Sequence, residues 1–133
     1  MLVTSLAHSE QPLYEIKANL FKALAHPARI RVLEILAANG RPTSVGEILS
    51  ATDIEPTLLS QHLAVLKRHF VVRHQRVGKA VFYQLAHPKI AELLVIARLF
   101  LVDTLRARQG QMDAMMSLPP LTAPTASATA LAG

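Results

Sequence analysis

Apolar residues recur at helical spacing along much of the chain. Within residues 12–24 they fall at i, i+3, i+7, i+8 and i+11, counted from Leu13, which aligns them on one face of a helix. A second helix is predicted to begin at Pro27, because the fixed φ of proline suits a first helical position, and to stop at Asn39-Gly40. Two helices are therefore expected before residue 41.

The next stretch predicts a helix-turn-helix. Ser44 and Glu47 have the spacing of a capping box, in which each side chain satisfies a backbone N–H group of the other residue, so a short helix is predicted to about Ala51. Residues 52–55 read as a turn, and Pro56 begins the following helix. Two helices joined by about four residues make this motif.

The helix that begins at Pro56 has two distinct faces at about 100° per residue. The stripe predicted to be buried consists of Leu59, Leu63, Leu66 and Phe70. The opposite arc consists of Thr57, Ser60, Gln61, Ala64, Lys67 and Arg68. Hydroxyl and amide groups can contact base edges, a small residue allows close approach, and cations suit phosphates, so this arc predicts a DNA-reading surface. An ordinary solvated face is the alternative.

His62 lies at the margin between these two faces. It can contact a base, or it can pack and form a hydrogen bond at the edge of the motif. The pattern leaves both roles open.

A basic β-hairpin is predicted after this helix. Two apolar runs, 71–72 and 81–85, flank Gly78, whose freedom at positive φ suits the turn. The cations predicted to hold phosphates or enter a minor groove are Arg73, Arg76 and Lys79. The fold class predicted is therefore mainly α with a small β-hairpin.

A last helix is predicted from Pro88 to about Arg108, and its apolar surface is broader than one neighbouring helix can cover. A symmetric dimer through the first and last helices would bury it. The residues predicted for this interface are Leu13, Ile16, Leu20, Leu94, Ala97, Leu101 and Leu105. A membrane-binding amphipathic helix is the rival, but the basic stripe on the polar face is too weak for it.

The domain organisation predicted is one unit with two tails. Residues 1–11 form a flexible arm, and residues 12–110 form the DNA-binding and dimerisation domain. Residues 111–133 comprise a short helical extension with three methionines and a tail of Pro, Ala and Thr that we expect to be disordered.

Charge is concentrated where the DNA surface is predicted. The chain of 133 residues has a formal net charge of +5, and residues 56–91 contain six Lys and Arg, four His and no Asp or Glu. Such clustering is the electrostatic footprint of a nucleic-acid-binding surface, with double-stranded DNA as the expected partner.

Composition excludes several other classes. The chain has no cysteine, so it can form neither a disulfide nor a thiolate metal site. No apolar run approaches the roughly 20 residues that span a bilayer, and no cationic leader precedes the first helix, so we expect a cytoplasmic protein without a membrane partner. The sequence contains neither a nucleophile paired with a base nor a pair of carboxylates that would indicate an enzyme.

Three segments stand out in order along the chain: the run from Leu24 to Leu33, the run from Ser60 to Leu66, and Gly78 with Phe82-Tyr83. Together they resemble the ArsR/SmtB family of winged helix-turn-helix repressors, and the similarity covers about residues 14–108. It implies a homodimeric repressor that sits on an imperfect palindrome and releases DNA when an inducer binds. The residues that it implies for DNA contact are Thr57, Ser60, Gln61 and His62 in the groove, and Arg76 and Lys79 on the wing.

Three departures limit what the resemblance implies. The cysteines of the family's thiolate sensors are absent, and of its Asp/His site on the last helix only Glu92 and Asp103 remain. The histidines elsewhere lack the i, i+4 spacing that would place two ligands on a helix face, so we expect no metal and no cofactor. Where the family has Gly after the recognition helix, this chain has Phe70. The inducer is not identified by the sequence.

Two other binding functions are alternatives for this fold. A winged helix can serve as a protein-interaction module, although such a module would not need the stretch from residue 56 to 91 that lacks acidic residues. RNA binding is disfavoured because few aromatic residues are available for stacking on bases.

Overall fold

The computed structural model describes residues 11–117. Its helices are α2 (Leu13–Leu24), α3 (Pro27–Asn39), α4 (Val45–Ala51), α5 (Pro56–Arg68) and α6 (Pro88–Ser117), and its strands are β1 (Thr43–Ser44), β2 (Val72–Val77) and β3 (Ala80–Leu85). The expected fold class, mainly helical with a β-hairpin, is confirmed. Of the arm expected over residues 1–11, residues 1–10 lie outside the described residues, as does the expected tail from residue 118.

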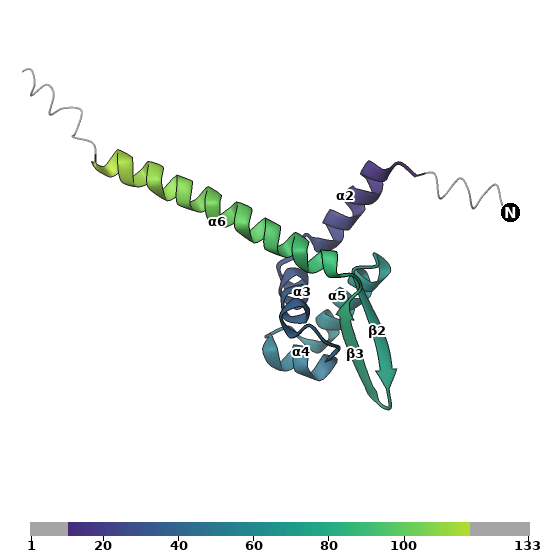
Figure 1. Ribbon diagram of the computed structural model, residues 1–133. Coiled ribbons are helices and arrows are strands. Elements are labelled where there is room, and N and C mark those ends of the chain that lie inside the picture. The colour runs from purple at the N-terminus through teal and green to yellow at the C-terminus, as the bar shows by residue number, and fades with distance from the viewer. Residues whose placement is uncertain (1–10, 118–133) are drawn as a thin grey trace, which may run out of the picture. The chain divides into compact units, whose positions relative to one another are not determined.

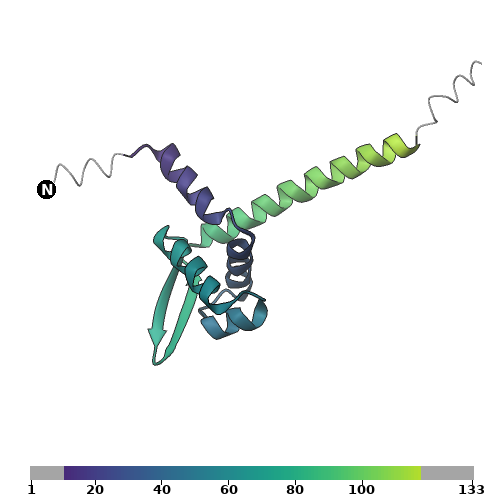
Figure 2. The ribbon, with the colours of Figure 1, turned by 180° about the vertical axis from the view of Figure 1, so that it is seen from behind.

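The chain divides into two compact units within α6. The first ends at Leu94, and the second begins at Val95. In the first unit, the views in Figure 1 and Figure 2 agree that α3, α4 and α5 pack together and that the hairpin of β2 and β3 projects from them as a wing. Of the second unit, the structure describes the long remainder of α6, a single continuous helix that includes Met112, Met115 and Met116.

The helix boundaries follow from capping residues close to the positions predicted. Pro27 is the first residue of α3, and Gly40, at φ +63°, ends it with its N–H bonded to the Leu36 carbonyl. The capping box is present as predicted: the Ser44 hydroxyl accepts from the Glu47 N–H at 3.1 Å, and the Glu47 carboxylate accepts from the Ser44 N–H at 2.8 Å. These local bonds start and stop helices without help from distant residues.

The sheet has a third strand that the sequence pattern did not predict. Strand β1 pairs antiparallel with β3, so that the order is β1-β3-β2. The two-residue strand has no periodicity to detect, but Thr43 is fully buried and its hydroxyl accepts from the Asn39 amide at 3.0 Å. This pairing holds the middle of β3 close to the end of α3, and it gives the wing support that a two-stranded ribbon alone would lack.

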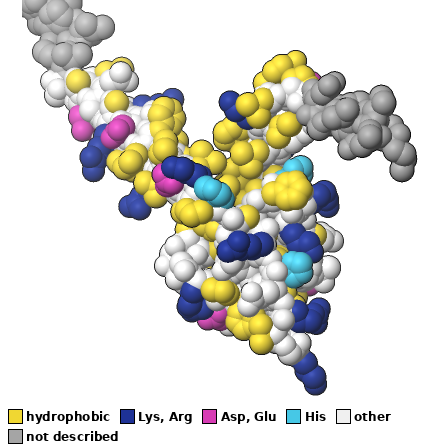
Figure 3. All heavy atoms as spheres, turned by 45° about the vertical axis from the view of Figure 1, so that its right-hand side comes forward, with side chains coloured by type: hydrophobic (Ala, Val, Ile, Leu, Met, Phe, Trp, Pro, Cys, Tyr) yellow, Lys and Arg dark blue, Asp and Glu magenta, His cyan; other side chains and the backbone are white. Residues whose placement is uncertain are grey.

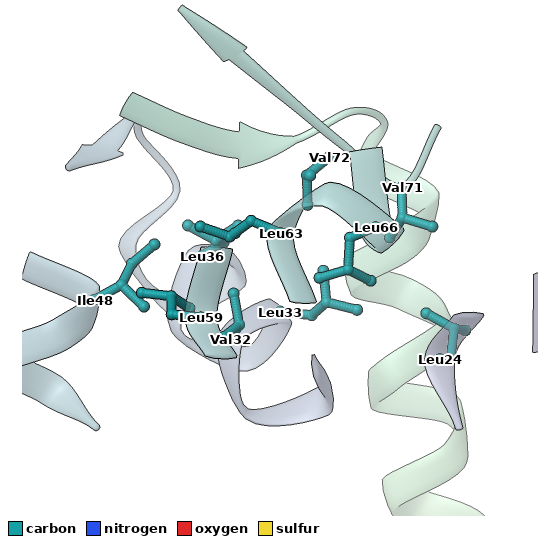
Figure 4. Close-up of a cluster of buried hydrophobic side chains, with 10 residues drawn as sticks. All are labelled: Leu24, Val32, Leu33, Leu36, Ile48, Leu59, Leu63, Leu66, Val71 and Val72. Atoms are coloured by element: carbon teal, nitrogen blue, oxygen red, sulfur yellow. The ribbon is translucent and has the colours of Figure 1, made fainter. Parts of the chain in front are cut away.

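The core lies between α3, α5 and the start of the wing. Figure 4 shows side chains from these elements and from α4 pointing toward one another. The cluster consists of Leu24, Val32, Leu33, Leu36, Ile48, Leu59, Leu63, Leu66, Val71 and Val72. The buried stripe predicted for α5 is thus right for Leu59, Leu63 and Leu66. Their burial fixes which side of α5 faces outward.

The prediction that Phe70 belongs to the buried stripe is wrong. The helix ends at Arg68, and Phe70 is 85% exposed with φ +58°. Its N–H bonds to the Lys67 carbonyl and the Val71 N–H bonds to the Leu66 carbonyl, which is the Schellman arrangement that usually has Gly at this position. The contact between buried Leu66 and Val71 holds the turn, and an L-residue in this conformation costs about 1–2 kcal/mol.

Candidate nucleic-acid interface

The polar arc of α5 is exposed as predicted. Glu55 caps the helix, because its carboxylate accepts from the Leu58 N–H at 3.2 Å, and a hydrogen bond from the Thr57 N–H is the main reason that the pKa of Glu55 is lowered. The exposed residues are Thr57, Ser60, Gln61, Ala64, Lys67 and Arg68. The cations lie in the last turn, where they also complement the helix dipole.

An open groove of about 520 Å³ separates α5 from the wing. On the helix side it is lined by Ser60, Ala64, Lys67 and Arg68, together with Leu63 at its floor. On the wing side it is lined by Val81 and Tyr83 of β3. Four residues of the arc and one face of the wing therefore border the same concave surface.

Strand alternation divides the basic residues of β2 between the two faces of the sheet. His74 pairs with Tyr83 across the strands, and their rings stack with centroids 5.6 Å apart, while Arg76 pairs with Val81. Arg76 therefore shares the face that borders the groove. Burial at this place raises the pKa of Tyr83.

Arg73 lies on the opposite face of the wing. It pairs with Gln84, and these two residues line a different pocket, away from α5. The expectation that Arg73 acts with Arg76 on phosphates is not supported by this placement, since the two are separated by an odd number of positions on one strand. The signal was present in the sequence, in the spacing of the two arginines.

The wing tip completes the basic surface. Gly78 adopts φ +64° in the turn, and Lys79 follows it before β3 begins. Figure 3 shows Lys and Arg side chains over the body of the first unit and down to its lowest point, with few acidic groups among them. Because β2 and β3 are each six residues long, these cations lie away from the core. At that distance they can contact a phosphate backbone.

His62 does not belong with the predicted groove residues. It is only 9% exposed and lies on the core side of α5. Its Nδ1 accepts a hydrogen bond from Arg29 Nε at 3.2 Å, and its ring centroid is 4.3 Å from that of His26. Of the two roles left open by the sequence, the structure supports the structural one.

Arg29 is the residue that sequence reasoning missed. Besides His62, its guanidinium donates to the Ala23 carbonyl at 3.0 Å, so one side chain connects the end of α2, α3 and α5. The only signal in the sequence was the position of Arg29 within the run that resembles the family's second helix. A cation facing a buried histidine cannot be read from periodicity.

The His62 environment predicts a pH-dependent stability. Burial, and then the charges of His26 and Arg29, lower the pKa of His62 in the folded protein. The stability contributed by neutral His62 is therefore present above its unfolded pKa of about 6.5 and lost as the pH falls through the folded pKa. We expect the free energy of unfolding to decrease more between about pH 7.5 and about pH 5.5 in the wild type than in His62→Gln, which keeps an acceptor for Arg29.

Urea unfolding at the two pH values measures this difference. His74→Gln is the matched control, because His74 is exposed on the wing, and it should retain the wild-type pH dependence. Equal pH dependence in His62→Gln and wild type would rule out this source of the effect.

The residues predicted for the dimer interface fall into two groups. Leu13, Ile16, Ala97, Leu101 and Leu105 are exposed, as an unpaired interface would be. Leu20 and Leu94 are half-buried and pack against the core cluster of their own chain.

Among residues 11–117, no group of three or more His, Asp or Glu side chains is placed to hold a metal ion. Over the same residues, no helix combines the length and apolarity needed to cross a membrane.

The comparisons with known proteins agree with this geometry. Residues 24–75 match a family described as a helix-turn-helix domain. An uncharacterized helix-turn-helix transcriptional regulator of Mycobacterium tuberculosis, Rv0081, is 52% identical over 104 residues, which are 77% of this chain and 90% of that protein. Its crystal structure superposes with a TM-score of 0.66 over 74% of this chain and 98% of that one.

A second solved structure names the family. The winged helix-turn-helix DNA-binding domain Mb0332 of Mycobacterium bovis, described as homodimeric and as a possible ArsR-family regulator, is 28% identical with a TM-score of 0.64. The match covers 71% of this chain and 86% of that domain. The chain belongs to the ArsR/SmtB family of winged helix-turn-helix transcriptional regulators. A biofilm growth-associated repressor of Agrobacterium fabrum is also similar, at 44% identity over 58% of this chain and 64% of that protein.

Membership of the ArsR/SmtB family decides between the two functions left open by the sequence. It favours a DNA-binding transcriptional regulator over a winged-helix module that binds proteins alone. In this fold α5 is the second helix of the helix-turn-helix, and the β2–β3 hairpin is the wing.

Proposed function

We propose that the protein is a homodimeric repressor that binds a specific DNA sequence, with α5 in the major groove and the wing on phosphates or in the adjacent minor groove. The observation that carries the proposal is the groove bounded by the exposed arc of α5 and by the face of the wing that bears Arg76. An α-helix with its side chains is about 10–12 Å across, so it fits the B-DNA major groove, which is about 12 Å wide.

The residues of the arc divide by chemistry. Thr57, Ser60 and Gln61 offer hydroxyl and amide groups to base edges, and Gln61 can bond adenine through two atoms. Ala64 allows the backbone of α5 to come near the bases. Lys67 and Arg68, at the far end of the helix, contact phosphates, which position the protein without reading sequence. His62 is left out because it is buried.

The wing supplies the second contact. Arg76 lies on the face toward α5, and Lys79 is at the tip. Two cations on a narrow hairpin suit the phosphates beside the groove that α5 occupies, or the minor groove next to it. Arg73 is not part of this set because it lies on the other face.

A homodimer on an imperfect palindrome fits the apolar surfaces and the relatives. Exposed leucines on α2 and α6 are available for a symmetric interface, and the related Mb0332 domain is described as homodimeric. A twofold dimer would place its two α5 helices on half-sites about 34–36 Å apart.

Repression is the direction of control that we propose. It is supported by the related biofilm growth-associated repressor. The protein would act in the cytoplasm, where its operator is found. A reporter gene downstream of the bound sequence would fall in expression when the protein is supplied, whereas an activator would raise it.

The test of the proposed function is recovery of genomic fragments bound by the protein, followed by fluorescence anisotropy on the recovered site over a series of salt concentrations. Each phosphate contact should lower log affinity by about 0.9 per log unit of salt. Lys79→Ala should weaken binding to operator and random DNA about equally and reduce the slope by about 1. An affinity that does not change with salt would contradict DNA binding.

Replacing Gln61 should act on specificity. Gln61→Ala removes the amide on the side of α5 opposite the buried stripe, so we expect it to reduce the preference for operator over random DNA by about 1–3 kcal/mol. Lys79→Ala is the control, since it removes a group of similar exposure with no expected base contact. If Gln61→Ala weakened both DNAs equally, its role in base reading would be wrong.

A further inference from the structure

A second concave surface lies on the side of the wing away from α5. It is a pocket of about 400 Å³ between the C-terminal end of α3, the base of the wing and the first turn of α6. All of its lining residues belong to the unit that ends at Leu94. Leu36, Ala37, Leu85 and Ala86 contribute apolar surface. The volume is within the range of small-molecule sites, about 300–1,000 Å³.

Arg73 presents a positive charge to this pocket. The Gln84 side chain fits best with its carbonyl oxygen toward Arg73, where it accepts from both Nε and Nη2 of the guanidinium. A guanidinium has five N–H donors, so three remain for a ligand. Gln84 is neutral, and it therefore orients the guanidinium without cancelling its charge.

Arg41 also lines the pocket, but its charge is compensated. It forms a two-point ion pair with Glu47, at 3.0 and 3.3 Å. No Asp or Glu is among the lining residues themselves. The pocket therefore carries about one uncompensated positive charge beside an apolar surface, which matches a small monoanion with an apolar body.

We propose that this pocket binds a small organic carboxylate, with the carboxylate on Arg73 and the apolar body against α3 and the base of the wing. The flat fork of a guanidinium matches the two oxygens of a carboxylate. The site is distinct from the DNA surface, since the odd spacing of Arg73 and Arg76 places them on opposite faces of β2.

A regulatory consequence rests on the proposed function. Ligand contact on one face of β2 would be transmitted to the other face of the same strand, which carries His74 and Arg76. Binding to the pocket would then alter the affinity for DNA, and DNA would alter the affinity for the carboxylate by the same factor.

The test uses benzoate and hexanoate as probes on the full chain. Saturation-transfer NMR and calorimetric titration report binding. Two control compounds separate the need for charge from the need for an apolar body: benzyl alcohol has an apolar body without a charge, and inorganic phosphate has a charge without an apolar body. We expect the carboxylates to bind better than either. Arg73→Gln should weaken carboxylate binding about tenfold or more by removing a charge-assisted hydrogen bond. Arg76→Gln, the same change on the other face of the same strand, should leave carboxylate binding unchanged.

DNA binding by the same variants keeps the two proposals separable. Arg76→Gln should weaken operator binding and lower its salt slope, whereas Arg73→Gln should not. Absence of binding by both carboxylates, or equal binding by wild type and Arg73→Gln, would overturn the pocket proposal. Carboxylate binding that needs Arg73, in a protein that binds no DNA, would support the pocket and reject the proposed function.

Discussion

Replacing Leu101 with glutamate should convert the proposed homodimer into a monomer. Leu101 is 53% exposed on α6, and on a helical wheel it lies within about 40° of Leu94, Ala97 and Leu105. A carboxylate in the centre of an apolar interface would be buried without a partner, which costs more than the contact contributes. A monomer binds a single half-site, so operator affinity should fall by about 100-fold or more.

Sedimentation equilibrium measures the mass, and anisotropy measures the affinity. Ala107→Glu is the control, because it introduces the same charge on the same helix, about 120° away from Leu101. It should leave the dimer intact. Leu101 is outside the unit that contains the core cluster, so circular dichroism should show the same helix content in the variant. An unchanged dimer mass in Leu101→Glu would reject the predicted interface.

Replacing Leu59 with alanine should destabilise the fold strongly. Leu59 is fully buried on α5 within the core cluster. Truncation removes apolar contact and leaves a cavity, so we expect the free energy of unfolding to fall by about 2–5 kcal/mol. Equilibrium unfolding in urea measures this change.

The adjacent residue provides a matched control. Leu58 is on the same helix but is 48% exposed, so Leu58→Ala should lower the free energy of unfolding by much less, about 1 kcal/mol or below. Equal losses in the two variants would show that α5 does not face the core as described. DNA binding by Leu59→Ala should decline only in proportion to the fraction unfolded.

Much of the local structure could be predicted from the sequence. The capping box at Ser44 and Glu47, the stop at Gly40 and the turn at Gly78 depend on residues a few positions apart. The same holds for the exposed arc of α5, since the period of the apolar residues defines which side of the helix is buried. These features are encoded by neighbours in the chain.

The wrong assignment of Phe70 to the buried stripe and the two open roles of His62 have other physical causes. A helical wheel assigns a face to Phe70, but the helix has already ended there, held by the contact of Leu66 with Val71. His62 is drawn to the buried side by Arg29, which is 33 positions away in the sequence. The Leu66–Val71 contact spans five positions, but the turn lacks the Gly that usually marks it, and the Arg29–His62 contact is long-range, so neither is visible in the apolar periodicity.

The sequence by itself determined the helices, their caps, the turn of the wing and the concentration of positive charge. The tertiary structure alone decided which distant residues meet: β1 with β3, Arg29 with His62, and α5 with the face of the wing that bears Arg76. The reason is that caps and helical periodicity depend on residues a few positions apart. Packing depends instead on which distant segments of the chain come into contact. This packing also gives the two faces of the wing different surroundings: the face that bears Arg76 borders the groove beside α5, and Arg73 lines the pocket at the end of α3.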